Sequence, residues 1–379
     1  MLILDDTQAL LKASAADFLA TRSPVKALRA LRDAGAPEAF DHALWEEMAN
    51  LGWPGALIPE AFGGSAIGYK GMGQILEESG RVLLASPLLA SSLVATSLLL
   101  RAGSPTQQEA WLPSLARGEI RAVLALDELP RHSPDTCRTL ASEGSTGYVL
   151  NGTKCFVPEA LGADLLLVVA ALGPVTSHAA PEPGVFLVPA GTPGINCRAL
   201  RMVDSRNAAI VQLDDVVLPV TARLGAGTPV REALSFALDA GRVGLAAEML
   251  GSAEEAFQRT LRYLKLREQF GVPIGSFQAL KHRAALLYCE LELTRSAVLA
   301  ALGALDSSPA EVPTLASLAK AKACDLIEQV SSEAVQMHGG IGMTDAEEIG
   351  LFLKRARVAQ QIYGDAGFHR ARYATLMGY

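Results

Sequence analysis

Apolar side chains in the first 118 residues recur at three- and four-residue spacing, which is typical of helices that bury one face. The spacing is clear over residues 10–19 and 43–51. Asp41 is suited to cap the start of the second of these helices, and Gly52 to end it. Residues 83–100 form the most apolar window. Because it contains Pro87 and five hydroxyl residues, we interpret it as a buried helix pair broken at that proline rather than a membrane span.

From about residue 119 the pattern changes to short apolar runs separated by Gly, Pro, Asn and Asp, namely RAVLAL, GYVLNGTKCFV, ADLLLVVAAL, GVFLVPA and AAIVQLDDVVL. Such runs predict strands. Helical spacing returns over 232–270, 276–305 and 313–338. The sequence therefore predicts a mainly α protein with an N-terminal helical domain (1–118), a small β-barrel or sandwich domain (119–225) and a C-terminal helical bundle (226–379).

Composition narrows the function classes. The chain has 379 residues and a net charge of −7, which argues against a nucleic-acid-binding surface and against a polybasic membrane anchor. Its five cysteines are scattered and show no CxxC spacing, so neither a disulfide framework nor a zinc site is expected. We expect a soluble cytoplasmic protein without a metal.

Two segments carry more specific chemistry, LREQFGVPIGSFQALKHR at 266–283 and QMHGGIG at 336–342. Arg267 is suited to bidentate, charge-assisted bonds with a pyrophosphate. Gln278 offers an amide to phosphate or ribityl oxygens. Gly339 and Gly340 permit a phosphate or adenosine to approach the backbone closely. Alternatively, the arginine is a surface ion-pair partner and the glycines only cap a helix.

These two segments resemble the acyl-CoA dehydrogenase family of flavoproteins, in which an R-x-x-F-G-x-x-I-x-x-F-Q run is followed about 60 residues later by Q-x-H-G-G-x-G. The stretch from Trp45 to Gly64 and the domain order extend the resemblance over essentially the whole chain. The resemblance implies a C-terminal four-helix bundle and FAD-dependent α,β-desaturation of an acyl-CoA thioester. It also implies electron-transferring flavoprotein as the electron acceptor and a homo- or hetero-oligomer, dimer or tetramer, in lipid or steroid catabolism.

In this family the matching residues bind the adenine half of FAD across a subunit contact. The resemblance assigns that role here to Arg267, Phe277, Gln278, Gln336, Met337, His338, Gly339 and Gly340. It implies that this chain reaches into a neighbour's flavin site.

The sequence departs from the family at the catalytic base. The family's glutamate lies in a Y-E-G-T motif, and here the stretch reads Tyr363-Gly364-Asp365-Ala366. A backbone N–H at Gly364 still offers a bond to the thioester oxygen. Other members place the glutamate before an arginine at the start of the first C-terminal helix, and here that pair is Gly241-Arg242.

Glu248 is the first candidate for a replacement base, because it is the lone carboxylate of an apolar helical run, VGLAAEMLG. Its A-A-E-x-x-G pattern is similar to that of a bacterial subgroup resembling the pimeloyl-CoA and steroid side-chain dehydrogenases, which often work as two-gene heteromers. The alternative is a packed helix residue paired with a cation of a partner chain. Asp365 is a further candidate for the base.

Substrate contacts and the chain's own flavin elements complete the prediction. Asp239 and Arg242 match positions that touch the acyl-CoA, with ordinary ion pairing as the alternative. The family's flavin loop, L-T-E-P-x-A-G-S-D, reads LDELPRHSPD here, and its W-I-T or W-I-S contact reads Phe156-Val157-Pro158, without the hydroxyl. Elements serving a partner's FAD are thus retained and those serving the chain's own FAD are eroded. This asymmetry predicts an active dehydrogenase half or a catalytically silent subunit that completes another chain's FAD site.

Overall fold

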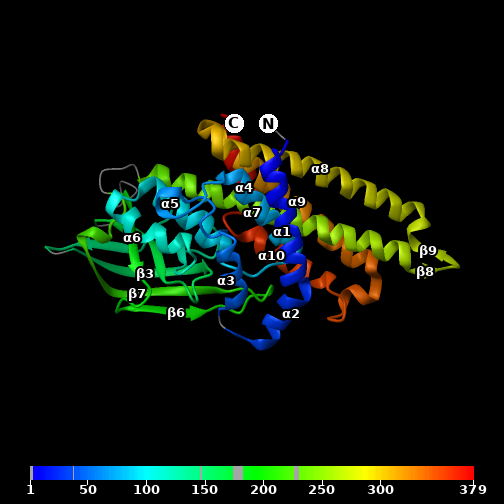
Figure 1. Ribbon diagram of the computed structural model, residues 1–379, viewed down its shortest axis with the longest axis horizontal. Helices are drawn as coiled ribbons and strands as arrows, with labels where there is room; N and C mark the ends of the chain where they lie inside the picture. Colours follow the sequence, from blue (N-terminus) through cyan, green and yellow to red (C-terminus); the bar gives the residue numbers. More distant parts are fainter. Residues whose placement is uncertain (1–2, 37, 146, 174–181, 226–229) are drawn as a thin grey trace. The chain divides into compact units, whose positions relative to one another are not determined.

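The computed structural model describes residues 3–36, 38–145, 147–173, 182–225 and 230–379 (Figure 1). These residues form two compact units, which are described separately. The first comprises Met1–Asp33, Tyr69–Leu84 and Arg242–Tyr379, and the second Ala34–Gly68 and Ala85–Gly241. The predicted boundary at 226 lies outside the described residues, and the three-domain division stays a prediction.

The first unit is helical. Helix α9 packs against α8, α10 and α11. The helices of this unit are α1 (Asp6–Arg22), α2 (Val25–Ala34), α4 (Gly68–Arg81), most of α7 (Val230–Leu266), α8 (Gln278–Ser307), α9 (Val312–His338), α10 (Ile349–Gln361) and α11 (Ala366–Leu376), with short 3-10 turns η4 (Ile274–Ser276), η5 (Pro309–Glu311) and η6 (Gly339–Met343). A two-stranded hairpin, β8 (Glu268–Gln269) and β9 (Val272–Pro273), follows α7.

Helices α4 and α7 cross with their backbones in direct contact. A Cβ added at Gly80 of α4 would lie 1.9 Å from the carbonyl oxygen of Glu248, and one added at Gly251 of α7 would lie 1.8 Å from the carbonyl oxygen of Glu77. Each helix therefore needs a glycine where the other passes, because any side chain would push the two apart. This crossing explains the glycine of the A-A-E-x-x-G pattern as a packing requirement.

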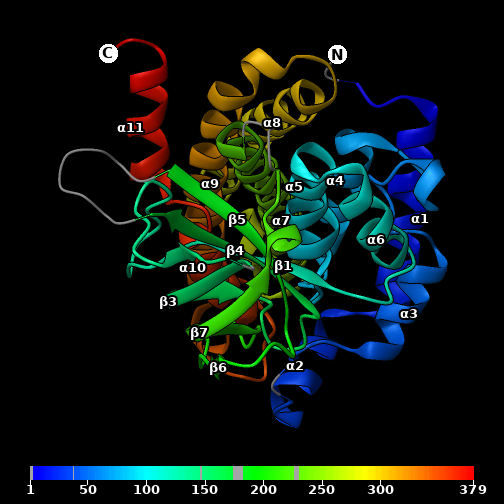
Figure 2. The same cartoon turned by 90° about the vertical axis from the view of Figure 1, so that its left-hand side faces the viewer.

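The second unit is built on a seven-stranded sheet in the order β1-β4-β2-β3-β7-β6, with β5 also paired to β4 (Figure 2). The strands are β1 (Ala122–Ala125), β2 (Leu140–Glu143), β3 (Gly147–Pro158), β4 (Leu165–Leu172), β5 (Glu182–Pro189), β6 (Ile195–Ala199) and β7 (Ala208–Pro219). The helical segments are α3 (His42–Asn50), α5 (Thr96–Ala102), α6 (Pro105–Ala116), η1 (Glu60–Phe62), η2 (Leu88–Ala95) and η3 (Val220–Ala222).

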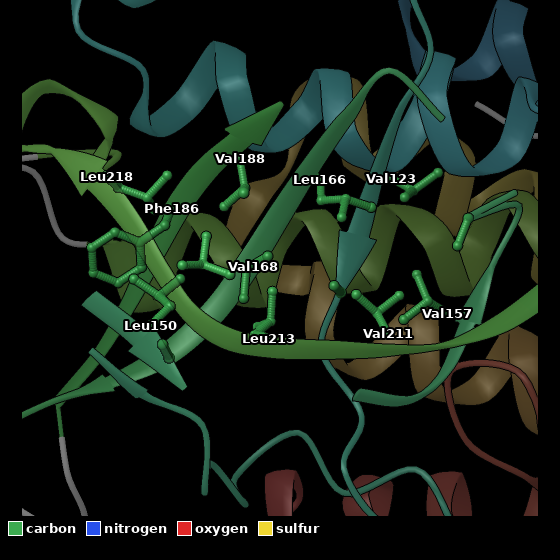
Figure 3. Close-up of a cluster of buried hydrophobic side chains, with 14 of the residues drawn as sticks. Val123, Leu150, Val157, Leu166, Val168, Phe186, Val188, Val211, Leu213 and Leu218 are labelled. Atoms are coloured by element: carbon green, nitrogen blue, oxygen red, sulfur yellow. The ribbon is translucent and has the colours of Figure 1, made fainter. Parts of the chain in front are cut away.

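Aliphatic side chains and Phe186 from facing strands fill the core of this sheet (Figure 3). Phe186 is fully buried and meets Tyr148 edge to face, with the ring centroids 5.0 Å apart. Buried and more exposed residues alternate along much of β3 and β7, so that one face of each strand points into this core.

The predicted fold class, mainly α with a central β region, is confirmed. Asp41 caps α3 as predicted, accepting hydrogen bonds from the backbone of Ala43 and Leu44. The prediction for residues 83–100 was wrong in detail. The segment is buried, but a π-helical stretch begins after Pro87 and continues into α5. No helix in the described ranges is long and apolar enough to cross a membrane.

Candidate functional site

The segment carrying Arg267 is a tight hairpin at the end of α7. Phe270 and Gly271 occupy its two turn positions with φ of +55° and +77°, as a type I′ turn requires. The hairpin closes through the backbone N–H of Ile274, which donates to the carbonyl oxygen of Arg267 at 2.8 Å. The Arg267 side chain is exposed, and within the described ranges its guanidinium has no hydrogen-bond partner. It is therefore available to an anion.

The second motif ends α9. His338 closes the helix, and Gly339 follows with φ +66°. A Cβ at Gly339 or Gly340 would meet nothing within 4 Å, so both glycines face open space. Gln336 is exposed, whereas Met337 is buried, so Met337 supports the turn from inside.

These two motifs meet through one pair of rings. Tyr263 of α7 stacks on His338, with centroids 4.4 Å apart and planes at 25°. Four residues after Tyr263, the N–H of Arg267 donates to the Tyr263 carbonyl oxygen at 2.8 Å. Both segments therefore lie at the same end of the first unit, where β8 and β9 are labelled in Figure 1.

Phe277 and Gln278 border this end. Phe277 is 38% exposed and meets the exposed ring of Phe270 edge to face, while Gln278 begins α8 and is exposed. An unpartnered guanidinium, two accessible amides and two open glycines fit an extended, anionic dinucleotide.

The position of the family glutamate, Gly364, is a closed turn. Tyr363 and Gly364 have φ of +58° and +105°. A Cβ at Gly364 would lie 2.4 Å from the Phe368 ring and 3.0 Å from Nε2 of His369. The Gly364 N–H donates to the carbonyl oxygen of Gln361 at 3.3 Å. The turn thus has no room for a longer side chain in this conformation.

Three buried basic side chains hold this turn. Lys320 of α9 donates to the carbonyl oxygens of Ala359 and Gln360 at 3.2 Å each and of Gly364 at 2.8 Å. Arg242 donates through Nε to the Tyr363 carbonyl oxygen at 3.2 Å, and His369 Nε2 lies 3.1 Å from the same oxygen. A carbonyl oxygen only accepts, so His369 carries its proton on Nε2.

The electrostatics of the turn follow from this burial. Burial lowers the pKa of Lys320. Burial, together with the nearby charges of Arg242 and Lys320, lowers the pKa of His369 to about 2, so its imidazole is neutral. Asp365 caps α11 by accepting a 2.8 Å bond from the N–H of Phe368. Asp365 therefore has a structural partner.

Glu248 is also engaged. It is buried on α7, and its Oε1 lies 2.9 Å from both Nε and Nη2 of Arg355 on α10. This arrangement favours the alternative of a packed, cation-paired helix residue, although the cation belongs to the same chain. A carboxylate that accepts two bonds from a guanidinium is a poor proton acceptor.

In the second unit, the loop after β1 is held by its own carboxylates. Glu128 accepts from Lys154 Nζ at 2.5 Å and from the N–H groups of Thr139, at 3.0 Å, and Arg138. Burial opposes the charge of Glu128, but Lys154 keeps its pKa below the usual value. Asp127 accepts from the ring of His132 and the backbone of Ser133.

The other predicted positions differ in burial. Val157 lies in the sheet core with no exposed surface, whereas Phe156 is half-buried, beside an irregularity in the pairing of β3 with β7 between Lys154 and Val157. Asp239 is buried on α7.

All five cysteines are free, and no cluster of metal-ligating side chains occurs in the part of the chain that is described.

Three residues that shape these sites were not predicted from the sequence, namely Tyr263, Lys320 and His369. Tyr263 lies four residues before Arg267, a spacing that places it one helical turn away and provided a signal. Lys320 and His369 lie in ordinary amphipathic helices, and their partners are backbone carbonyls that no sequence pattern marks.

Two family models match most of this chain. Residues 5–119 match the model of the acyl-CoA dehydrogenase N-terminal domain, and residues 230–377 match that of the C-terminal domain. The probable acyl-CoA dehydrogenase YngJ of Bacillus subtilis is 30% identical over 85% of this chain and 86% of its own.

Two solved structures are similar over nearly the full length. A variant of the Tcur3481-Tcur3483 steroid ACAD has a TM-score of 0.88 and 31% identity, covering 98% of both chains. The ChsE4-ChsE5 complex of Mycobacterium tuberculosis has a TM-score of 0.89 and 26% identity, covering 100% of this chain and 98% of its own. The chain therefore belongs to the acyl-CoA dehydrogenase family of FAD-dependent oxidoreductases, which act on CH–CH bonds.

Proposed function

We propose that this chain is an FAD-binding subunit of an acyl-CoA dehydrogenase that works with a second, non-identical chain. The observation that carries the proposal is a contrast within the first unit. The segments around Arg267 and Gly339 are open and joined to each other, whereas the turn at Gly364 is closed and lacks a carboxylate.

The chain's own residues would bind and orient the cofactor. Arg267 is suited to the pyrophosphate, Gln278 and Gln336 to neighbouring oxygens, and the N–H groups of Gly339 and Gly340 to the adenylate side. When bound, FAD supplies the acceptor for the hydride that leaves the β carbon of the acyl-CoA. The electrons would then leave the assembly for electron-transferring flavoprotein.

The proton acceptor would come from the partner chain. Within the described residues, neither family position for the glutamate carries one, Glu248 is paired with Arg355, and Asp365 caps a helix. Two of the similar structures are named as pairs of chains, and one is a steroid enzyme, which supports a two-chain assembly for an acyl-CoA of lipid or steroid catabolism.

The visible spectrum and the flavin content per chain test this proposal. The protein should be purified alone and together with an acyl-CoA dehydrogenase encoded beside it. We expect the chain alone to be colourless or inactive, and the co-expressed assembly to be yellow and bleached by its acyl-CoA. A chain that binds one flavin and is bleached without any partner would refute the need for a second chain.

A pair of variants in the assembly tests whether this chain binds the flavin through Arg267. Arg267→Ala should lower flavin content, whereas Arg262→Ala, which removes an exposed arginine bound to Glu255, should not. Equal flavin content in both variants would mean that the Arg267 segment does not bind the cofactor.

A further inference from the structure

The end of the first unit that carries the two open segments contains a very short hairpin. The hairpin after α7 consists of two residue pairs, Glu268 with Pro273 and Gln269 with Val272. Leu266, just before it, and Phe270 in its turn are 81% and 91% exposed. A hairpin this short is not stable by its own hydrogen bonds, so its placement depends on the helix end from which it emerges.

That helix end is fixed by the stacked pair Tyr263 and His338. The His338 ring is itself fixed, because its Nδ1 lies 2.7 Å from the Ala334 carbonyl oxygen one turn earlier in α9 and only 4% of the residue is exposed. The Tyr263 ring stacks on this immobilised ring, with the two planes 25° apart. The Tyr263 carbonyl oxygen accepts the N–H of Arg267, and the next residue after His338 is Gly339. One ring pair therefore joins the backbone of Arg267 to the backbone of the glycine turn.

We propose that Tyr263 is a positioning residue of the dinucleotide site, which sets the spacing between Arg267 and the Gly339–Gly340 turn by stacking on His338. This inference rests on the proposed function, because the ligand is taken to be FAD. Tyr263 does not itself contact the ligand. It keeps the guanidinium and the glycine N–H groups at the separation that one diphosphate-linked nucleotide spans, so that binding does not have to order them.

The test is FAD affinity, measured by quenching of flavin fluorescence when FAD is added to the apo assembly of this chain with its partner. Tyr263→Phe keeps the ring, so its Kd for FAD should stay within about twofold of wild type. Tyr263→Leu keeps an apolar side chain but removes the ring, so its Kd should rise about three- to tenfold. Tyr288→Leu is the matched control, because Tyr288 stacks on Phe257, which precedes Tyr263 on the same helix, at 6.4 Å and away from the hairpin.

A double-mutant cycle separates positioning from general stability. In an Arg267→Ala background, Tyr263→Leu should change the Kd less than it does alone, because the group that it positions has been removed. A purely structural role would lower the melting temperature of the apo assembly and leave the two effects on FAD affinity additive. Additive effects, or an unchanged Kd in Tyr263→Leu, would overturn the inference.

Two further results keep the outcome clear. If Tyr263→Leu does not accumulate, His338→Gln disrupts the same stack from α9 and should raise the Kd by a similar factor. If the wild-type assembly binds no FAD at all, the proposed function is wrong. If the wild-type assembly binds FAD and the Tyr263 variants bind it equally well, only the positioning role of Tyr263 is wrong.

Discussion

Replacing Glu248 by Gln separates its two possible roles. Glu248 and Arg355 are buried, at 4% exposure each, and joined by two contacts of 2.9 Å. Neutralising one member of a buried pair leaves the other charge poorly compensated, which costs about 3–5 kcal/mol. For a cooperative unit of roughly 150–250 residues, this corresponds to a fall in melting temperature of at least about 6 °C.

The assay pairs thermal unfolding with bleaching of the flavin by acyl-CoA in the assembly. A second variant, Glu248→Leu with Arg355→Met, removes both charges and should recover most of the lost stability. If Glu248 is structural, bleaching recovers with stability in this double variant. If Glu248 is the base, Glu248→Gln keeps wild-type stability but loses bleaching, and the double variant stays inactive. That second pattern would refute our interpretation of the ion pair.

Three further predictions concern single positions. The pKa of His369 is about 2 when folded, below the value of 6.5 expected when unfolded, so the unfolded chain binds the extra proton and stability is lost as the pH falls below about 6.5. The loss should reach about 2 kcal/mol at pH 5, measured by denaturant unfolding, and His369→Gln should remove this slope. Gly80→Ala should destabilise the α4–α7 crossing by more than about 3 kcal/mol, whereas Gly303→Ala, a helical position with nothing within 4 Å, should stabilise by about 0.5–1 kcal/mol in the same assay. Gly364→Glu restores the family's residue but should lower the melting temperature and give no bleaching by the chain alone, because its Cβ meets the Phe368 ring at 2.4 Å and φ is +105°. Bleaching by that variant alone would show that the turn opens easily.

Long, regular elements were predictable from the sequence because their pattern repeats many times. The predicted helices at 232–270, 276–305 and 313–338 correspond to α7, α8 and α9, except that α7 ends at Leu266 rather than at residue 270. The five predicted strands are all present. The strands β2 and β6 were missed, since most of their residues are exposed and no alternation marks them. The π-helical stretch η2 was also missed, because its residues are apolar on all sides and show no hydrophobic periodicity.

Some residues of the candidate site were likewise predictable from the sequence, and others were not. The turn at Gly339 was recognisable, because glycine is needed there for an unusual φ and a close approach to the backbone. The hairpin after Arg267 was missed, because the helical spacing was read through residue 270 although α7 ends at Leu266. The assignment of Glu248 could not be made from the sequence. An isolated glutamate in an apolar helix predicts a perturbed carboxylate, but its partner Arg355 lies 107 residues away, on a helix whose placement no local pattern reveals.

The turn at Gly364 stands where the resemblance places the family's glutamate, and contacts with buried side chains hold it closed. A non-glycine residue with positive φ costs of the order of 1–3 kcal/mol, and Tyr363 keeps such a conformation because surrounding groups enforce it. Lys320, Arg242 and His369 supply that enforcement by binding the carbonyls of the turn, and the space for a side chain at Gly364 is filled by the next helix. Since the acceptors are backbone oxygens, this network does not require a glutamate and survives its loss. The closed turn therefore supports the proposal that this chain keeps the segments around Arg267 and Gly339 while the proton acceptor comes from a partner.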